Sequence, residues 1–288
     1  MQFVIAIGCA YLAVLLLLAV FQRKLLYQPG RHQHLAVERF PELSQLFPET
    51  RDIEISCDDR VTIRGWLLQH EPAATRPLIL LFHGNAGDRS NRMGWYQMFS
   101  SLDVDVLAMD YHGYGDSGGN PSEASLKSDG AAAWHFATGE LGYQPSRIFV
   151  MGISLGGAVA VDVAARESTR QPVGGLIVIS SFSSMVDTSS YHYPWVPVSL
   201  LLRDRYPSAA TIRSLQCPYL HLHGDQDQVV PMSLGEKLFA AAPAESRGIP
   251  RRWVTMRDTD HNDLLYNAAH VIRTELQEFI ENCQGIRP

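Results

Sequence analysis

The chain has 288 residues, with 24 lysines and arginines against 30 aspartates and glutamates, and its formal net charge is -6 at pH 7. This length suffices for one α/β domain with a core of its own. A slightly acidic chain offers no basic surface to nucleic acid, so we expect no partner of that class. The four cysteines are scattered without a CxxC pair, which predicts neither a zinc site nor a disulfide framework.

The first segment of the chain is apolar. Residues 3–21 (FVIAIGCAYLAVLLLLAVF) carry no charge and no proline, and at about 1.5 Å per residue they are long enough to cross a hydrocarbon core of ~30 Å. A cleaved signal peptide and a lipoprotein lipidated at Cys9 are alternatives. However, no positive region precedes the run, no small-residue cleavage site follows it, and most of it lies after Cys9. We therefore predict an uncleaved transmembrane anchor at 1–24 and a linker at 25–49.

The charges beside the apolar run indicate its orientation. Arg23 and Lys24 follow it directly, and only the α-amino group precedes it. The positive-inside rule places such flanking basic residues in the cytoplasm. We therefore expect a single-pass membrane protein whose C-terminal domain is cytoplasmic.

From about residue 50 onward, apolar runs alternate with stretches that have helical periodicity. The runs are DIEIS, VTIRGWLL, PLILLFHG, VDVLAMDY, RIFVMG, GGLIVISS, YLHLHG and RRWVTM. The first two alternate in polarity around a turn at Asp58 and Asp59, which predicts antiparallel strands, and the later ones are almost continuously apolar, which predicts parallel strands covered on both faces. Helices are predicted at 89–102, 123–141, 155–167, 233–242 and 263–282. Residues 50–288 are therefore predicted to form an α/β domain with a mostly parallel central sheet and helices on both faces.

One connection is longer than the others. Residues 183–217 separate GGLIVISS from YLHLHG, and long loops in compact domains are commonly lids or binding loops. We expect a short cap here, in which Tyr191, Tyr193 and Trp195 are candidate substrate-binding residues. An apolar cap favours a fatty-acyl chain, and the ordinary apolar underside of a lid is the alternative.

GISLG, at residues 152–156, lies between the strand RIFVMG and the helical stretch LGGAVAVDVAARE. A nucleophile elbow places its serine on a strained turn between a strand and a helix, where small flanking residues let the backbones pack closely. A bare GxSxG occurs by chance in many proteins, so it is this context that indicates Ser154 as a nucleophile. The start of the helix also presents N–H groups and a positive dipole end to an anionic intermediate.

A serine hydroxyl needs a general base, and that base needs a carboxylate to orient it. After such an elbow the expected order is serine, acid, histidine. HGDQDQVVP follows one strand and offers Asp225 and Asp227, and TDHND follows the next strand with His261. Both loops lie at carboxyl ends of strands, where parallel sheets gather their active sites. The eleven histidines show no HExxH or other ligand spacing, so we expect no metal.

Two glycine-rich segments follow other strands. HGNAG, at residues 83–87, fits the loop that donates one N–H group to an oxyanion hole, which would come from the backbone of Asn85, with the second from Leu155. A simple glycine-rich turn is the alternative. DYHGYGDSGG, at residues 110–119, is a second such strand exit. No GxGxxG opens a helix there, so we expect no dinucleotide cofactor.

With HGNAG, GYGDSGG, GISLGG, HGDQDQVVP and DHND in order, the chain resembles the α/β-hydrolase superfamily over residues 50–284. The resemblance implies an α/β-hydrolase fold and a serine hydrolase that uses no metal or organic cofactor. The HGxxDxxVP pattern of that superfamily selects Asp227 over Asp225 as the acid. On the apolar segment, FQRKLLYQP and HGNAGDRSNR, the chain is similar to the single-pass, membrane-anchored serine hydrolases that include lysophospholipid lipases and protein depalmitoylases.

Residues and resemblance together predict a serine hydrolase that acts on an acyl ester or thioester substrate at a membrane lipid bilayer. Ser154, Asp227 and His261 would act through a covalent acyl-enzyme. The acyl-chain length and the oligomeric state stay open at this stage, because one fold hosts many acyl-transfer reactions. A peptidase on the same fold is an alternative, since it shares the tetrahedral chemistry. A non-catalytic binding protein is the alternative of a different class, against which the intact serine, acid and histidine argue.

Overall fold

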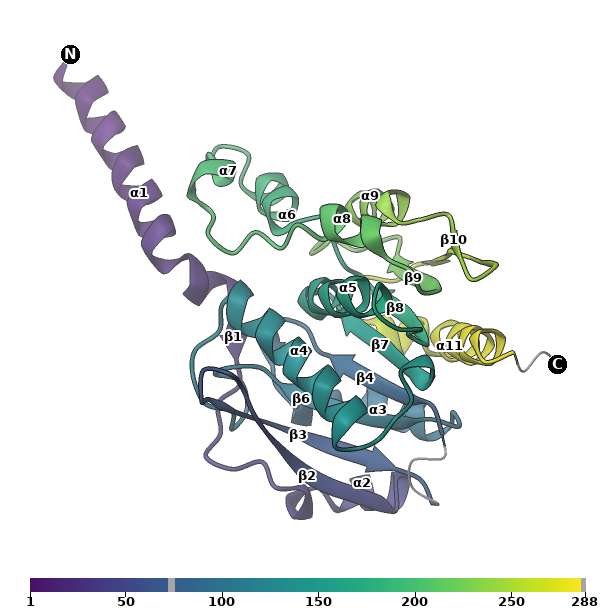
Figure 1. Cartoon of the computed structure of the whole chain (residues 1–288). Coiled ribbons are helices and arrows are strands. Elements are labelled where there is room, and N and C mark those ends of the chain that lie inside the picture. The colour runs from purple at the N-terminus through teal and green to yellow at the C-terminus, as the bar shows by residue number, and fades with distance from the viewer. Residues whose placement is uncertain (72–75, 286–288) are drawn as a thin grey trace.

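Within residues 1–71 and 76–285, which the computed structural model describes, the centre is an eight-stranded sheet in the order β12-β9-β8-β7-β4-β6-β3-β2 (Figure 1). Strands β12, β9, β8, β7, β4 and β6 run parallel to one another. Strand β3 pairs antiparallel with β6 and with β2. The bounds of these strands are β2 Glu49–Ser56, β3 Thr62–Gln69, β4 Leu78–Phe82, β6 Asp105–Asp110, β7 Ile148–Ile153, β8 Gly175–Ile179, β9 Tyr219–Gly224 and β12 Arg252–Met256.

The burial of the strands follows their sequence patterns. Every residue of β4, β6, β7, β8 and β9 is buried, as the continuous apolar runs predict for parallel strands covered on both faces. In β2, only the alternate residues Ile53 and Ile55 are buried, which fits an edge strand with one face in solvent. The predicted mostly parallel sheet with an antiparallel pair at one edge is confirmed.

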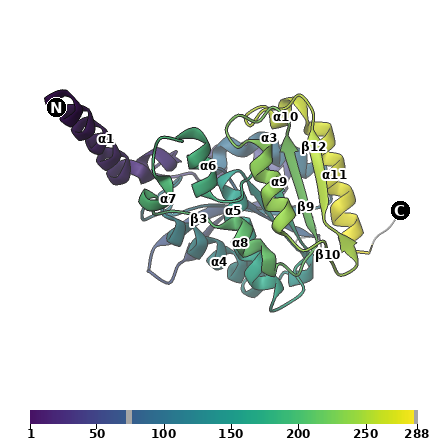
Figure 2. The same cartoon turned by 90° about the horizontal axis from the view of Figure 1, so that it is seen from above.

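Helices cover both faces of the sheet and enclose two apolar cores (Figure 2). One core packs α4 and α5, with α9 at its margin, and the other packs α2, α3, α10 and α11. The bounds are α2 Pro41–Leu46, α3 Met93–Ser100, α4 Glu123–Gly139, α5 Leu155–Ser168, α9 Met232–Ala241, α10 Leu264–Asn267 and α11 Ala269–Cys283. The short elements are η1 Val37–Arg39, η2 Arg89–Arg92, η3 Pro145–Arg147, β1 Gln28–Pro29, β5 Ala86–Gly87, β10 Glu245–Ser246 and β11 Ile249–Pro250.

Two predicted helices are divided. The range 89–102 begins as the 3₁₀ helix η2, which Asp88 caps by accepting the Ser90 N–H at 2.8 Å, before α3 starts. The range 263–282 breaks between α10 and α11. At the end of α10, the Asn267 side chain donates to the Asp258 carbonyl at 2.9 Å and so turns the chain back toward the preceding loop.

The range 25–49, expected to be a linker, is packed into the domain. Leu43 and Phe47 are fully buried, and β1 pairs in parallel with β5. The Leu35 N–H donates to Asp116 at 2.9 Å, and the Leu35 carbonyl accepts from the indole of Trp66 at 2.9 Å. This segment is therefore held against the domain by buried side chains and hydrogen bonds, and it is not a flexible linker.

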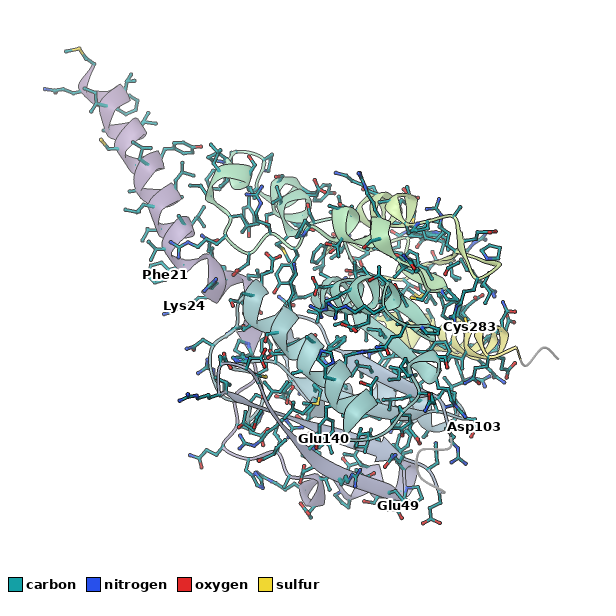
Figure 3. The ribbon with its side chains drawn as sticks, viewed as in Figure 1. Phe21, Lys24, Glu49, Asp103, Glu140 and Cys283 are labelled. Atoms are coloured by element: carbon teal, nitrogen blue, oxygen red, sulfur yellow. The ribbon has the colours of Figure 1, made fainter. Side chains whose placement is uncertain are left out.

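Helix α1 (Gln2–Leu26) projects from the domain as a single rod (Figure 1). None of its residues is buried in the structure. Within the described ranges it is the one helix long and apolar enough to cross a membrane. Phe21 and Lys24 lie near its domain end (Figure 3). In length and composition, the helix agrees with the predicted anchor.

The insertion at residues 183–217 forms the cap. It contains α6 (Met185–His192), α7 (Val198–Leu201), α8 (Ser208–Thr211) and η4 (Ile212–Ser214). It connects β8 to β9, and α6 and α7 lie on the side of the domain from which α1 projects (Figures 1 and 2). The cap therefore lies beside the domain end of the anchor (Figure 1).

Candidate active site

Ser154 occupies a strained turn between β7 and α5. Its φ and ψ are 54° and -121°, values that L-residues rarely adopt and that cluster at functional sites. The Ser154 N–H donates to the Ile179 carbonyl of β8 at 2.9 Å, which fixes the turn against the neighbouring strand. The side chain thus projects beyond the carboxyl end of the sheet, as predicted for a nucleophile elbow.

The glycines around this serine are required by close backbone contacts. A Cβ atom on Gly152 would collide with the Gly156 carbonyl, and one on Gly156 would collide with the Phe82 carbonyl of β4. In both cases the obstacle is backbone, which cannot move aside as a flexible side chain does. The elbow therefore needs glycine at both positions, and this physical need explains the GISLG pattern.

The structure brings together the three residues predicted to act as a triad. Asp227 follows β9 and His261 follows β12. His261 Nδ1 lies 2.7 Å from Asp227 Oδ2, and His261 Nε2 lies 3.0 Å from Ser154 Oγ. Because a carboxylate only accepts, Nδ1 carries the hydrogen and Nε2 is left to accept from the serine hydroxyl. The competing acid Asp225 is exposed on the same turn.

The Asp227 carboxylate is held ionised. Its Oδ1 accepts backbone N–H groups from Val229 at 3.0 Å and Val230 at 2.7 Å. Burial acts to raise the pKa of Asp227, but His223, His261 and the Val230 amide together hold that pKa well below its usual range. A charged carboxylate is the state that can stabilise an imidazolium on His261.

Two histidines of β9, His221 and His223, lie near Asp227. The sequence did not predict that they would contact the site. His223 Nε2 donates to the Val230 carbonyl at 2.8 Å and lies 3.5 Å from Asp227 Oδ2. His223 Nδ1 lies 3.2 Å from His221 Nε2, whose Nδ1 accepts from the Tyr219 hydroxyl at 2.6 Å. Burial lowers the pKa of His221 well below its ordinary value, so its ring is neutral. Tyr219, His221 and His223 recur at a spacing of two in β9, which is the sequence signal for side chains on one face of a strand.

The predicted oxyanion donors lie beside Ser154. A Cβ atom on Gly84 would stand 3.5 Å from Ser154 Cβ, which places the HGNAG loop against the serine. His83 Nδ1 donates to the Gly84 carbonyl at 2.7 Å and so fixes the peptide whose other end is the Asn85 N–H. Leu155 is the first residue of α5, where helical N–H groups have no carbonyl partner within the helix.

A buried charge network holds the HGNAG loop. Arg89 Nη1 lies 2.5 Å from Asp110 Oδ2 and 2.7 Å from Asp116 Oδ1, and His83 Nε2 lies 3.1 Å from Asp110 Oδ1. Burial acts to lower the pKa of Arg89, but the two carboxylates raise that pKa above its usual value. The sequence segments DRSNR and GYGDSGG therefore meet as one buried ion cluster. Sequence reasoning gave them no such role.

A cleft of about 420 Å³ opens at Ser154. It is lined by residues of the HGNAG loop, by Trp95 and by residues of the segment from His261 to Tyr266. The cleft is large enough for an acyl group and its carbonyl.

Tyr191, Tyr193 and Trp195, predicted to bind substrate in the cap, do not line the cleft at Ser154 and are half or more exposed. Trp195 and Tyr193 lie toward α1 instead. The Trp195 and Tyr11 rings have centroids 6.5 Å apart, the Trp195 carbonyl accepts from the Tyr11 hydroxyl at 2.8 Å, and Tyr193 lines a separate cavity against the helix. Spacing along an irregular segment does not fix side-chain direction, which is why the sequence did not show that they lie away from the cleft at Ser154. Their role in binding substrate stays a prediction.

One trio of side chains has the geometry to hold a metal ion. Cys57, His112 and Asp129 are buried, with their ligand atoms within 4.8 Å of one another. They already satisfy each other, since His112 Nδ1 lies 2.5 Å from Asp129 Oδ1 and the Cys57 thiol donates to the same oxygen at 3.6 Å. Their mutual hydrogen bonds account for their proximity, and the absence of a metal stays a prediction.

Comparison with known proteins places the chain in a family. The family model for the alpha/beta hydrolase fold matches residues 77–215. An uncharacterized protein of Mycobacterium tuberculosis is 38% identical over 242 residues, which cover 84% of this chain and 81% of the relative. Protein bem46 of Schizosaccharomyces pombe is 34% identical over 233 residues, with coverages of 78% and 77%.

A named enzyme and a solved structure extend the comparison. The lysophosphatidylserine lipase ABHD12 of Xenopus tropicalis is 30% identical over 228 residues, which span 73% of this chain and 58% of the lipase. An esterase of Pyrococcus furiosus superposes with a TM-score of 0.68 at 17% identity, covering 89% of this chain and 98% of the esterase, a likeness of fold alone. The chain belongs to the α/β-hydrolase family, and this membership supports a hydrolase activity.

Proposed function

We propose that the protein is a serine hydrolase that cleaves the carboxylic ester or thioester of an acyl lipid through a covalent acyl-enzyme. The observation that carries the proposal is the hydrogen-bonded chain from Asp227 through His261 to Ser154, with heavy-atom distances of 2.7 and 3.0 Å. These distances lie within the range for a nucleophile and its base. The strained backbone of Ser154 supports the same role.

The reaction follows from the roles of these groups. As Ser154 Oγ attacks the acyl carbonyl, His261 Nε2 takes its proton and Asp227 stabilises the resulting imidazolium. The oxyanion accepts hydrogen bonds from the Asn85 and Leu155 N–H groups, each contributing about 3 kcal/mol to the transition state. The intermediate collapses as His261 protonates the leaving alcohol or thiol, and water then releases the acid by the same steps.

The acyl-lipid class has two supports. A relative that covers most of this chain is named a lysophosphatidylserine lipase, although the aligned region is 58% of that enzyme. The cleft at Ser154 also has an apolar lining in Trp95, Leu264 and Leu265, which suits a hydrocarbon group.

A substrate panel on the purified full chain tests this proposal. Esters, thioesters and amides that share one acyl group should be turned over in the first two classes and not in the third. The reason is that an alcohol or thiol is a better leaving group than an amine for the same tetrahedral intermediate. Faster turnover of aminoacyl amides would identify a peptidase, and failure on every class would leave a binding protein.

We also propose that α1 crosses the membrane once and leaves the domain in the cytoplasm. The full chain should stay in the membrane fraction after alkaline carbonate, and in sealed right-side-out vesicles the domain should resist added protease until detergent is present. The double variant Leu12→Arg and Leu16→Arg should appear in the soluble fraction, because each charge in a span costs about 3 kcal/mol. Both leucines are exposed on α1. Recovery of wild-type protein with a shortened N-terminus would instead identify a signal peptide.

A further inference from the structure

A second cavity, of about 190 Å³, lies between α1 and the cap. Its walls are apolar on both sides, with Leu18, Ala19 and Leu25 from α1 facing Met185, Val198 and Leu201 from the cap. It has room for about six groups the size of a water molecule, at ~30 Å³ each. Such a space is too narrow for a helix and fits a stretch of a single hydrocarbon chain.

Gln22, one of the polar residues that line this cavity, is hydrogen-bonded within the protein. Gln22 Nε2 donates to the Leu201 carbonyl at 3.2 Å, and Gln22 Oε1 accepts the Arg203 N–H at 2.7 Å. Both ends of the amide are thus paired with cap backbone. Apart from Gln22, Ser189 and Tyr193, the residues that line the cavity are apolar, so the surface that meets an occupant is mostly apolar.

Further polar contacts hold the two walls at a fixed separation. Arg23 pairs with Asp204 through two hydrogen bonds of 2.8 and 3.0 Å. The hydroxyls of Tyr27 and Tyr206 lie 2.8 Å apart and are buried. Because α1 is clamped to the cap at its domain end, the cavity is a preformed feature of the fold.

The position of the cavity along α1 indicates what fills it. It lies on the last turns of the one helix in the described ranges that could span a membrane. Trp195, next to the lining residue Val196, is half exposed, and Arg23 and Lys24 lie within the stretch of α1 that lines the cavity. An exposed tryptophan together with basic residues at one end of an apolar span is typical of the boundary between hydrocarbon and headgroups. The molecules available to an apolar cavity at that depth are lipid acyl chains.

The cavity adjoins the cleft at Ser154 through one residue pair. Leu26 lines the cavity, and its carbonyl accepts from Asn85 Nδ2 at 3.0 Å. Asn85 in turn lines the cleft at Ser154, and its own carbonyl accepts the Gln28 N–H at 3.0 Å. An acyl chain in the cavity would therefore have its carboxyl end near the predicted oxyanion donor.

We propose that the cavity between α1 and the cap binds the acyl chain of a membrane lipid and presents its ester to Ser154. This inference rests on the proposed function, and it assigns to α1 a substrate-binding role in addition to anchoring. Selectivity for chain length would then be set by the side chains of α1 and the cap.

Filling the cavity tests this assignment. Ala19→Trp places an indole in the cavity, and Ala13→Trp, on an exposed position of the same helix that does not line it, is the matched control. In Ala19→Trp the ratio of kcat/KM for a palmitoyl ester to that for a butyryl ester should fall about tenfold, as expected when several methylenes lose their pocket. Ala13→Trp should keep the wild-type ratio, and an unchanged ratio in Ala19→Trp would overturn the proposal.

A crosslinking experiment gives a readout that does not need turnover. Full chain carrying Ser154→Ala, in liposomes with a palmitoyl lysophospholipid bearing a terminal diazirine, should crosslink on irradiation to residues 18–26 and 185–202. Adding Ala19→Trp should remove these crosslinks, whereas adding Ala13→Trp should retain them. Crosslinks confined to the outer side of α1, where Phe21 lies, or unaffected by Ala19→Trp, would overturn the proposal even if esters are hydrolysed. Cavity crosslinks without ester turnover would instead count against the proposed function alone.

Discussion

Ser154→Ala should abolish ester turnover, with a loss in kcat on the order of 10⁶-fold, and should abolish labelling by a serine-directed fluorophosphonate. The physical reason is that no other atom occupies the place of Oγ, 3.0 Å from the base on His261. In wild type, mass spectrometry should find the phosphonate adduct on Ser154. Labelling that persists in the alanine variant would assign the nucleophile elsewhere.

Ser180 offers a matched control for this variant. It is also buried, has a positive φ of 48°, and its hydroxyl has no hydrogen-bond partner in the structure. Ser180→Ala therefore removes one buried hydroxyl from a strained backbone position, as Ser154→Ala does. It should keep both turnover and labelling, which separates the loss of a nucleophile from a general effect of truncating a buried serine.

The central sheet could be predicted because its signal is local. A strand covered by helices on both faces must be apolar at every position, so the runs that became β4, β7 and β8 were visible without any partner. The elbow at Ser154 was visible for a related reason, since it is a strand, a glycine-flanked serine and a helix in immediate succession.

The path of the segment 25–49 could not be predicted, because the contacts that fix it join residues far apart in sequence. Leu35 is held by Asp116 and Trp66, and neither pairing leaves a periodic pattern in the segment itself. The same limit applies to the cap. Trp195 turns toward α1 because the helix supplies Tyr11 as its partner.

The histidines behind Asp227 show how a site can extend beyond the residues with a recognisable motif. Their place in β9 predicts that they are buried, and burial alone is compatible with a purely structural role. Only the three-dimensional arrangement shows that His223 donates to the Val230 carbonyl. The N–H group of the same residue, Val230, donates to the Asp227 carboxylate. Asp227, the proposed catalytic acid, is therefore held by its own loop and by His223, a strand residue four positions earlier.

Asp227→Asn should lower kcat by up to ~10⁴-fold on the precedent of serine proteases, while KM changes little. An asparagine amide can donate to His261 Nδ1 and so favour the tautomer that has its hydrogen on Nε2. In that tautomer Nε2 can no longer accept from Ser154. The imidazolium that forms on His261 also loses the negative charge of the carboxylate beside it. Asp225→Asn is the matched control, since this carboxylate is exposed two residues away, and it should retain activity within a few-fold of wild type. Steady-state kinetics on one short-chain ester, with circular dichroism to show that both variants are folded, measures the difference. A larger loss in Asp225→Asn than in Asp227→Asn would mean that the carboxylate 2.7 Å from His261 in this structure is not the one that supports its protonated form during turnover.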